Sequence, residues 1–170
     1  MGDPRRFDLM ADLVMTRLPW EGQPRIVDVA GGRGGMQAAL RKRDFTNVVS
    51  MDICHSYAKG RSGYKYGLFT RDEPAQFDLV VAMHPDDATD HAILYAVDHS
   101  IPWFVCPCCV RPAAVPCKSG RNDYWRWIDH LRTIGGGQGT VETITLPMKG
   151  RNVALMGNLS YHAPAPSPRP

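Results

Sequence analysis

The chain has 170 residues, with 20 Lys and Arg against 17 Asp and Glu, and its formal net charge is +3. This length is typical of about one domain, and the small basic excess gives only slight support for a nucleic-acid partner. No apolar run approaches the roughly 20 residues of a membrane-spanning helix, and the first residues lack the apolar core of a signal peptide. We therefore expect a soluble, intracellular and cytoplasmic protein with no membrane partner.

Helical and strand patterns alternate along the first two thirds of the chain. Apolar residues at helical spacing predict a helix from Phe7 to Leu18, closed by Pro19 and Gly22. The segments that follow are, in order, a strand over 26–30, a helix over 35–43, a strand over 47–53, a stretch without helical period over 54–63, a weak strand over 64–70, a strand over 77–83, a helix over 86–99 capped by Asp86, and a strand over 102–107.

The last third of the chain predicts one helix and a pair of strands. The helix ends at the glycine-rich segment 135–139 and presents to the sheet an apolar face made of Tyr124, Trp127, Ile128 and Leu131. Two strands over 140–146 and 151–159 form a hairpin, and the Pro-rich tail over 163–170 is predicted to be disordered. We predict a single domain over residues 1–162, in which helices cover both faces of a mostly parallel sheet.

The segment DVAGGRGG, residues 28–35, joins the first strand to the next helix. In doubly wound sheets the ligand binds beyond the carboxyl ends of the strands, where glycines allow the backbone to approach it closely. A dinucleotide pattern of the type G-x-G-x-x-G, started at Gly32, would need a glycine at Gln37, which disfavours a nicotinamide cofactor. The alternative is a glycine turn that binds nothing.

Two acidic residues accompany the glycines. Asp52 ends the second strand, 18 residues after Gly34, where a carboxylate is expected to accept the hydroxyl hydrogens of a ribose. Its alternative role is to cap a turn. Asp28 lies within a buried strand, so that its charge must be satisfied by loop amides, by a cationic ammonium group of the ligand, or by both.

An α/β sheet that ends in a hairpin, together with this loop, resembles the class I S-adenosylmethionine-dependent methyltransferases. The segment DVAGGRGG resembles their fingerprint, although Ala30 replaces its first glycine. The resemblance implies a doubly wound, Rossmann-like α/β sheet, mostly parallel with a C-terminal antiparallel hairpin. It also implies that S-adenosylmethionine is the cofactor and that the residues binding it are Asp28, Ala30, Gly31, Gly32, Gly34 and Asp52.

The region from about 77 to 156 contains MHPDDATDHAI, CPCCV and LPMKGRNVAL. These motifs resemble a group of eukaryotic methyltransferase-like proteins that includes a tRNA 2′-O-methyltransferase. The resemblance favours an RNA acceptor, and it leaves open a small molecule, a protein and the participation of a partner subunit. A scaffold or binding protein that kept the fold without turnover is the other class of function.

His84 ends the strand that borders the predicted cofactor crevice. Methyl transfer to an alcohol or a ring nitrogen needs alignment and the removal of one proton, which a histidine near neutral pH can accept. We therefore place His84 among the candidate catalytic residues. The alternative is that its imidazole only hydrogen-bonds its own loop at Pro85 and Asp86.

Four of the five cysteines lie close together, at positions 106, 108, 109 and 117. Their odd number and clustering favour reduced thiols over a disulfide framework. Neighbouring cysteines fit the usual C-x-x-C metal loop poorly, so we predict no metal. Cys108 or Cys109 could be the nucleophile of an RNA cytosine-C5 methyltransferase, and both are candidate catalytic residues. The favoured interpretation is a shaped loop in which Pro107 turns the chain and the thiols pack beside the acceptor.

Two groups of residues are candidates for contact with RNA. Trp125 and Arg126 face outward from the predicted helix and could stack on bases, together with the nearby Arg121. The basic run 41–43 could grip phosphate. Ordinary packing and a solvated helix end are the favoured interpretations.

Overall fold

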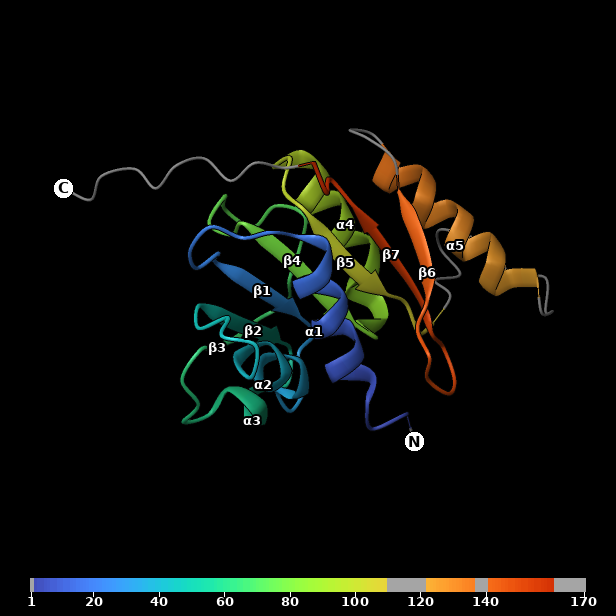
Figure 1. Ribbon diagram of the computed structural model, residues 1–170. Coiled ribbons are helices and arrows are strands. Elements are labelled where there is room, and N and C mark those ends of the chain that lie inside the picture. The colour runs from blue at the N-terminus through green and yellow to red at the C-terminus, as the bar shows by residue number, and fades with distance from the viewer. Residues whose placement is uncertain (1, 110–121, 137–140, 161–170) are drawn as a thin grey trace.

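The structure is a computed structural model that describes residues 2–109, 122–136 and 141–160. Its strands belong to one sheet of order β3-β2-β1-β4-β5-β7-β6 (Figure 1). The strands are β1 (Ile26–Val29), β2 (Val48–Asp52), β3 (Tyr64–Tyr66), β4 (Leu79–Met83), β5 (Trp103–Cys106), β6 (Glu142–Thr145) and β7 (Val153–Gly157). The first five strands pair in parallel, whereas β7 is antiparallel to both β5 and β6. The predicted α/β fold class is confirmed.

Helices cover both faces of this sheet (Figure 1). They are α1 (Arg6–Arg17), α2 (Gly35–Arg41), the one-turn α3 (His55–Ala58), α4 (Thr89–Asp98) and α5 (Asn122–Gly135), with a short 3-10 helix, η1 (Asp86–Ala88), before α4. Within the described segments, no helix is long and apolar enough to cross a membrane.

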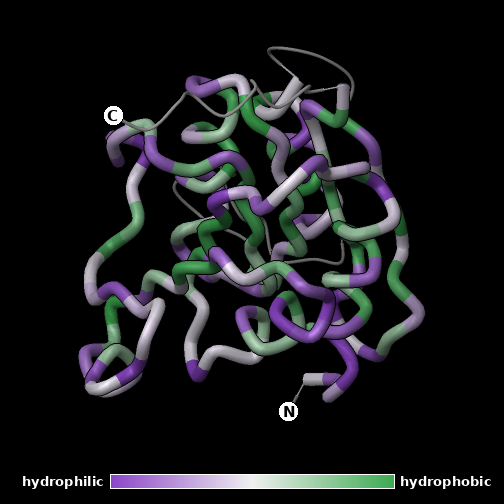
Figure 2. Tube along the Cα trace, turned by 60° about the vertical axis from the view of Figure 1, so that its left-hand side comes forward, coloured by the Kyte–Doolittle hydropathy of each residue, from purple (hydrophilic) through white to green (hydrophobic). Residues whose placement is uncertain are grey.

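Two apolar cores lie on either side of the sheet because successive strand residues point to opposite faces. In β1, Val27 and Val29 join the core under α4 and α5, whereas Ile26 joins the core under α1 and α2. Figure 2 shows hydrophobic residues concentrated toward the middle of the fold and hydrophilic residues in many outer turns. Strands buried on both faces explain the continuous apolar runs in the sequence.

Trp103, one of two fully buried tryptophans in the core, opens β5 opposite Gly157 of β7. A Cβ atom at Gly157 would lie 2.6 Å from the indole nitrogen of Trp103, and one at Gly135 would lie 2.6 Å from its ring carbon Cζ2. The two glycines therefore make room for one indole, which fixes the end of α5 against the start of β5.

Two local predictions were wrong. The helix expected over 86–99 begins only at Thr89. Asp86 makes no capping hydrogen bond, because its backbone lies in the left-handed region (φ 48°) and it is the first residue of η1. The stretch 54–63, expected to lack a helix, contains α3, which at four residues is too short to show a helical period.

Other predictions lie at or beyond the limits of the described residues. The chain from Gly67 to Asp78 connects β3 to β4 without a helix. The predicted domain end at 162 and the tail at 163–170 lie outside the described residues, as does Cys117.

Candidate cofactor and acceptor site

The glycine segment at the carboxyl end of β1 contains three residues in the left-handed backbone conformation. Ala30, Gly32 and Gly34 have φ angles of 53°, 54° and 81°. The Gly34 amide donates to the Gly31 carbonyl at 2.9 Å, which closes the turn just before α2. A left-handed conformation is costly for a residue with a Cβ, so Ala30 is held there by the turn around it.

The glycines in this segment serve different purposes. An added Cβ at Gly31 would lie 2.8 Å from Ser50 Cβ and collide with the Asp28 carboxylate, and one at Gly34 would collide with the Tyr64 hydroxyl. By contrast, nothing lies within 4 Å of a Cβ placed at Gly32. Packing inside the protein therefore accounts for Gly31 and Gly34, while Gly32 is the position whose backbone is open to a ligand.

Asp28 lies beneath the loop and does not face the crevice. Its side chain is 1% exposed, and it accepts a hydrogen bond from the Ser50 hydroxyl at 2.7 Å. Burial, with a smaller contribution from the nearby Asp52 charge, raises the pKa of Asp28 from 3.8 to about 7, although the Ser50 hydrogen bond opposes this rise. Asp28 is therefore satisfied by Ser50 within the protein and lies beneath the loop that it supports.

Asp52 ends β2 beside Gly32, as the sequence predicts. Its Oδ2 accepts a hydrogen bond from the Gly32 amide at 2.9 Å, and its Oδ1 accepts one from the Cys54 amide at 2.8 Å. Each carboxylate oxygen keeps a further lone pair, so the group can still accept hydrogen bonds from vicinal hydroxyls. The backbone hydrogen bonds fix the direction in which the carboxylate points.

An apolar residue that the sequence analysis missed follows this acid. Ile53 directly follows Asp52, and its side chain is 67% exposed. An apolar side chain next to a carboxylate that can bind a ribose is suited to cover the flat face of a base. Asp52, Ile53 and the open backbone of Gly32 therefore fit the nucleoside part of S-adenosylmethionine.

His84 lies at the carboxyl end of β4, next to β1 in the sheet. Its φ is 58°, and its amide donates to the Cys106 carbonyl at 2.9 Å. Its Nε2 lies 2.9 Å from the Arg151 carbonyl oxygen, so the imidazole contacts the β6–β7 connection, whereas the alternative interpretation was a bond to its own loop. Because a carbonyl only accepts, Nε2 carries the hydrogen, and in the neutral ring Nδ1 holds the lone pair that can take a proton.

The thiols of the β5 loop contact Asp86. Cys108 donates to Asp86 Oδ1 at 2.8 Å, and Cys109 Sγ lies 3.5 Å from the same oxygen. Burial, with a further contribution from Asp86, raises the pKa of Cys108 above its usual range, and burial raises the pKa of Cys106 to about 12. Since the thiolate is the reactive form, Cys106 and Cys108 are weak nucleophiles in this arrangement.

The same three groups satisfy the distance requirement for ligands of one ion. Asp86, Cys108 and Cys109 place their ligand atoms within 4.8 Å of one another. Local sequence spacing indicates only the cysteines as ligands, because the Asp86 carboxylate lies 22 positions from Cys108.

Arg151 and Tyr124 also belong to this end of the sheet. The Arg151 guanidinium lies 3.9 Å from the centre of the Tyr124 ring, and the Tyr124 hydroxyl donates to the Pro107 carbonyl at 3.3 Å. The Arg151 carbonyl accepts from both His84 and Cys106. The β6–β7 connection and α5 therefore border the space between His84 and the β5 loop.

The outward residues of α5 lie as predicted. Tyr124 is buried, Trp125 is 56% exposed, and Arg126 forms an ion pair with Asp123 at 3.7 Å. Arg121 lies outside the described residues.

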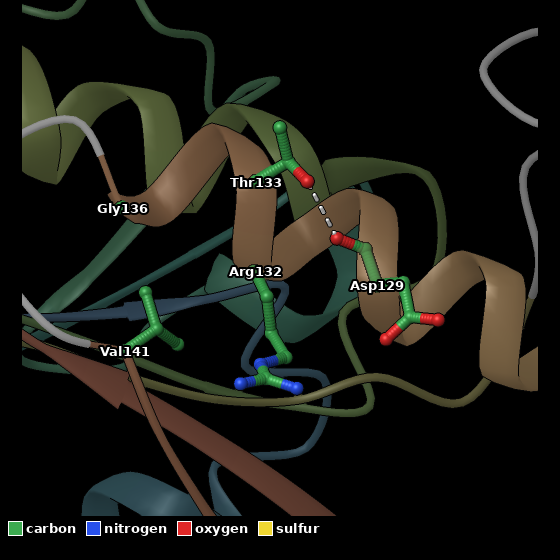
Figure 3. A pocket seen from close by; sticks show the side chains of 5 residues that line it. All are labelled: Asp129, Arg132, Thr133, Gly136 and Val141. Atoms are coloured by element: carbon green, nitrogen blue, oxygen red, sulfur yellow. Dashed lines mark hydrogen bonds between the residues drawn. The ribbon is translucent and has the colours of Figure 1, made fainter.

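A pocket of about 370 Å³ lies between the end of α5 and the start of β6. Figure 3 shows its lining residues, Asp129, Arg132, Thr133, Gly136 and Val141. Because Gly135 packs on Trp103 at the start of β5, this pocket lies at the end of the sheet opposite to His84.

No protein-family model matches the chain, and no curated protein matches its sequence. Solved structures do match its fold, and they include S-adenosylmethionine-dependent methyltransferases. A Methanococcus maripaludis protein assigned to that class superposes with a TM-score of 0.57 at 13% identity, over 89% of this chain and 84% of that protein. An Anabaena variabilis protein, assigned as a methyltransferase of an antibiotic biosynthesis pathway, gives 0.50 at 15% identity, over 81% of this chain and 64% of its own.

The cyclase SpnF is also similar, with a TM-score of 0.50 and 20% identity over 81% of this chain and 58% of SpnF. This chain spans less than two thirds of the length of both SpnF and the Anabaena protein. At these identities the likeness shows a shared fold, and the chemistry must be argued from the site.

Proposed function

We propose that this chain, whose fold is that of the class I S-adenosylmethionine-dependent methyltransferases, transfers a methyl group from S-adenosylmethionine to RNA of a tRNA-like kind or to a small molecule. The observation that carries the proposal is the pairing of Asp52 with Gly32 at the carboxyl ends of β2 and β1. It holds a carboxylate and an open stretch of backbone at the place where doubly wound sheets bind nucleosides.

Each residue of the site would have a separate role in binding the cofactor. Asp52 would accept the ribose hydroxyls, Ile53 would cover the base, and the Gly32 backbone would approach the ligand, while Asp28 would support the loop from below. S-adenosylmethionine, when bound, supplies an electrophilic methyl group on a sulfonium. The protein must then align the acceptor and remove its proton.

His84 is the residue proposed to take that proton. Its Nε2 is held by the Arg151 carbonyl, which directs the ring and leaves Nδ1 as the basic atom. Fixing the orientation of a base in this way favours proton transfer, because the group need not be ordered during the reaction. The acceptor would approach between His84 and the loop of Cys108 and Cys109.

The choice of RNA as acceptor has support from the resemblance of MHPDDATDHAI and CPCCV to the eukaryotic methyltransferase-like group. The net charge of +3 favours it slightly. A small molecule is the other proposed acceptor.

A second candidate is a binding protein that kept the fold without turnover. The observation that favours it is that side chains on the acceptor side already form hydrogen bonds within the protein. His84 Nε2 bonds to the Arg151 carbonyl, and Cys108 donates to Asp86. The cyclase SpnF illustrates that this fold supports activities other than methyl transfer. Cytosine-C5 methylation by Cys108 has the least support, because the raised pKa keeps this thiol protonated.

Transfer of label distinguishes these functions. The protein would be incubated with S-adenosylmethionine labelled in its methyl group and with either RNA or a metabolite extract from cells that lack the protein. We expect label in one of the two fractions, and mass spectrometry would then identify the methylated atom. Binding of the cofactor without label in either fraction would support the binding protein.

A further inference from the structure

Three arginines from separate segments converge on one pocket beside the glycine loop. The pocket has a volume of about 270 Å³ and lies between α2 and the segment that leads into β3. Arg33 comes from the loop, Arg41 from the end of α2 and Arg61 from the chain after α3. Gln37, Ser62 and Tyr64 are among its other lining residues.

Internal contacts hold this arrangement in place. An Arg61 Nη1 donates to the Arg33 carbonyl at 2.9 Å, and the Arg61 guanidinium lies 5.5 Å from the centre of the Tyr64 ring. Gln37 Nε2 donates to the Gly63 carbonyl at 2.7 Å, and the Arg41 guanidinium lies against Gly63, where an added Cβ would be 2.7 Å from its Nη2. The pocket is therefore part of the fold and not a chance gap between long side chains.

The charges in the pocket are not balanced. No Asp or Glu lines it, and none of its three arginines forms an ion pair within residues 2–109, 122–136 and 141–160. Of the other arginines in the described segments, Arg6, Arg132 and Arg151 likewise form no ion pair, whereas six do pair with carboxylates, and they are Arg5, Arg17, Arg25, Arg43, Arg71 and Arg126. Like charges that are brought together without a partner repel, and a bound anion would relieve that repulsion.

We propose that this arginine pocket binds phosphate groups in the backbone of single-stranded RNA. Guanidinium groups present forked donors that match phosphate oxygens, and convergence of several on one pocket is typical of phosphate sites. The three arginines are exposed, so that a polymer can contact them while it continues along the surface. The identity of the ligand as RNA rests on the proposed function, whereas the anion site does not.

The pocket is connected to the cofactor crevice through one residue. The Tyr64 hydroxyl donates to the Gly32 carbonyl at 3.3 Å, and the Gly32 amide donates to Asp52 at 2.9 Å. Arg33, which lines the pocket, directly follows Gly32 in the glycine loop. RNA held in the pocket would thus be anchored beside the ends of β1 and β2, where the cofactor is proposed to bind.

The test compares two neighbouring residues of equal charge. Arg41 lines the pocket, whereas the exposed Lys42 does not, so Arg41→Glu and Lys42→Glu make the same change in net charge one residue apart. Binding of a fluorescent RNA of about 15 nucleotides would be followed by anisotropy. We expect Arg41→Glu to weaken binding by about tenfold or more and Lys42→Glu by less than about threefold.

A further control lies in the pocket of Figure 3. Arg132→Glu makes the same charge change near β6, the edge strand on the other side of the sheet from β3, and is expected to behave like Lys42→Glu. Arg61→Gln provides a second pocket variant in case Arg41→Glu fails to fold, which thermal unfolding would reveal. Arg61→Gln should also lower the salt dependence of RNA binding by about one phosphate contact.

Equal weakening by Arg41→Glu, Lys42→Glu and Arg132→Glu would overturn the proposal, because it would mean a diffuse charge effect. Absence of RNA binding by the unmodified protein, or binding of inorganic pyrophosphate alone, would overturn it too. Calorimetry with S-adenosylmethionine on the same proteins separates this inference from the proposed function. Cofactor binding without RNA binding contradicts the inference only.

Discussion

The amide of Gly32 donates a hydrogen bond of 2.9 Å to the carboxylate of Asp52, 20 positions further along the chain. This bond joins the loop after β1 to the end of β2, the two segments between which a nucleoside would lie. The Cys54 amide holds the second oxygen of the same carboxylate. The direction of Asp52 is thus set by the backbone before any ligand arrives.

Replacing Asp52 by Ala is expected to weaken the binding of S-adenosylmethionine by about 1–3 kcal/mol, since the ribose hydroxyls would lose their acceptor in the crevice. Isothermal calorimetry would measure the change. Asp72→Ala, which removes an exposed carboxylate from the β3–β4 connection, is the matched control and should leave affinity unchanged. Equal affinity of the Asp52→Ala variant and the unmodified protein would place the cofactor elsewhere.

Replacing His84 by Ala should lower turnover by about 10²–10⁴-fold while cofactor affinity stays nearly intact, because the imidazole is proposed to remove the acceptor's proton. Single-turnover transfer of labelled methyl groups and calorimetry would measure the two quantities separately. His130→Ala removes a histidine that stacks on Trp127 away from the crevice, and it serves as the control. A joint loss of binding and turnover in the His84 variant would instead indicate a structural histidine that holds the Arg151 connection.

Cys108→Ser and Cys109→Ser should retain substantial activity, because a serine hydroxyl can replace a thiol that donates to Asp86 but cannot replace a nucleophilic thiolate. Methyl transfer by each variant would be compared with that of the unmodified protein. An inactive Cys109→Ser variant with an intact fold would favour cytosine-C5 chemistry.

Purified protein is expected to carry no stoichiometric zinc or iron. Asp86, Cys108 and Cys109 are close enough to share an ion, but Cys108 and Cys109 are neighbours in the chain, which suits a tetrahedral site poorly, and burial and Asp86 favour the protonated thiol of Cys108. Elemental analysis would measure the number of metal ions per chain. One metal ion per chain would make these three residues its ligands.

The buried Asp28 should make stability depend on pH in an unusual direction. Its pKa is raised from 3.8 to about 7, so the folded protein holds a proton that the unfolded chain has already released between these values. The contribution is therefore complete below about pH 4 and is lost as pH rises toward 7, by roughly 1 kcal/mol per pH unit.

Asp28→Asn removes this titration while its amide oxygen can still accept from Ser50. Urea unfolding at several pH values should show the variant gaining stability relative to the unmodified protein as pH rises from about 4 to 7. Asp44→Asn, at an exposed position, is the control. A constant difference between Asp28→Asn and the unmodified protein across this range would mean that Asp28 is ionised in the fold.

The sequence predicted the features that depend on local pattern. The spacing of Met10, Ala11 and Val14 predicted α1, and the position of Asp52 after an apolar strand placed the acid correctly beside the glycine loop. Long periodic segments carry this information because the same face must be buried at every turn.

Contacts between distant segments could not be predicted in this way. Arg151 meets His84 across 67 positions, and Asp86 meets Cys108 across 22. Arg33 and Arg61 share a pocket only because the segment before β3 lies against the glycine loop, where Arg61 donates to the Arg33 carbonyl. Such pairings depend on sheet order and loop direction, which no local spacing encodes.

The placement of β7 between β5 and β6 has a consequence for how the protein is made. During synthesis from the N-terminus, β6 is complete while both it and the edge of β5 still lack the strand that joins them. Unpaired edges of apolar strands readily associate with other chains. The nascent protein therefore stays vulnerable to aggregation until Val153–Gly157 has left the ribosome, and chaperone binding should concentrate in that interval.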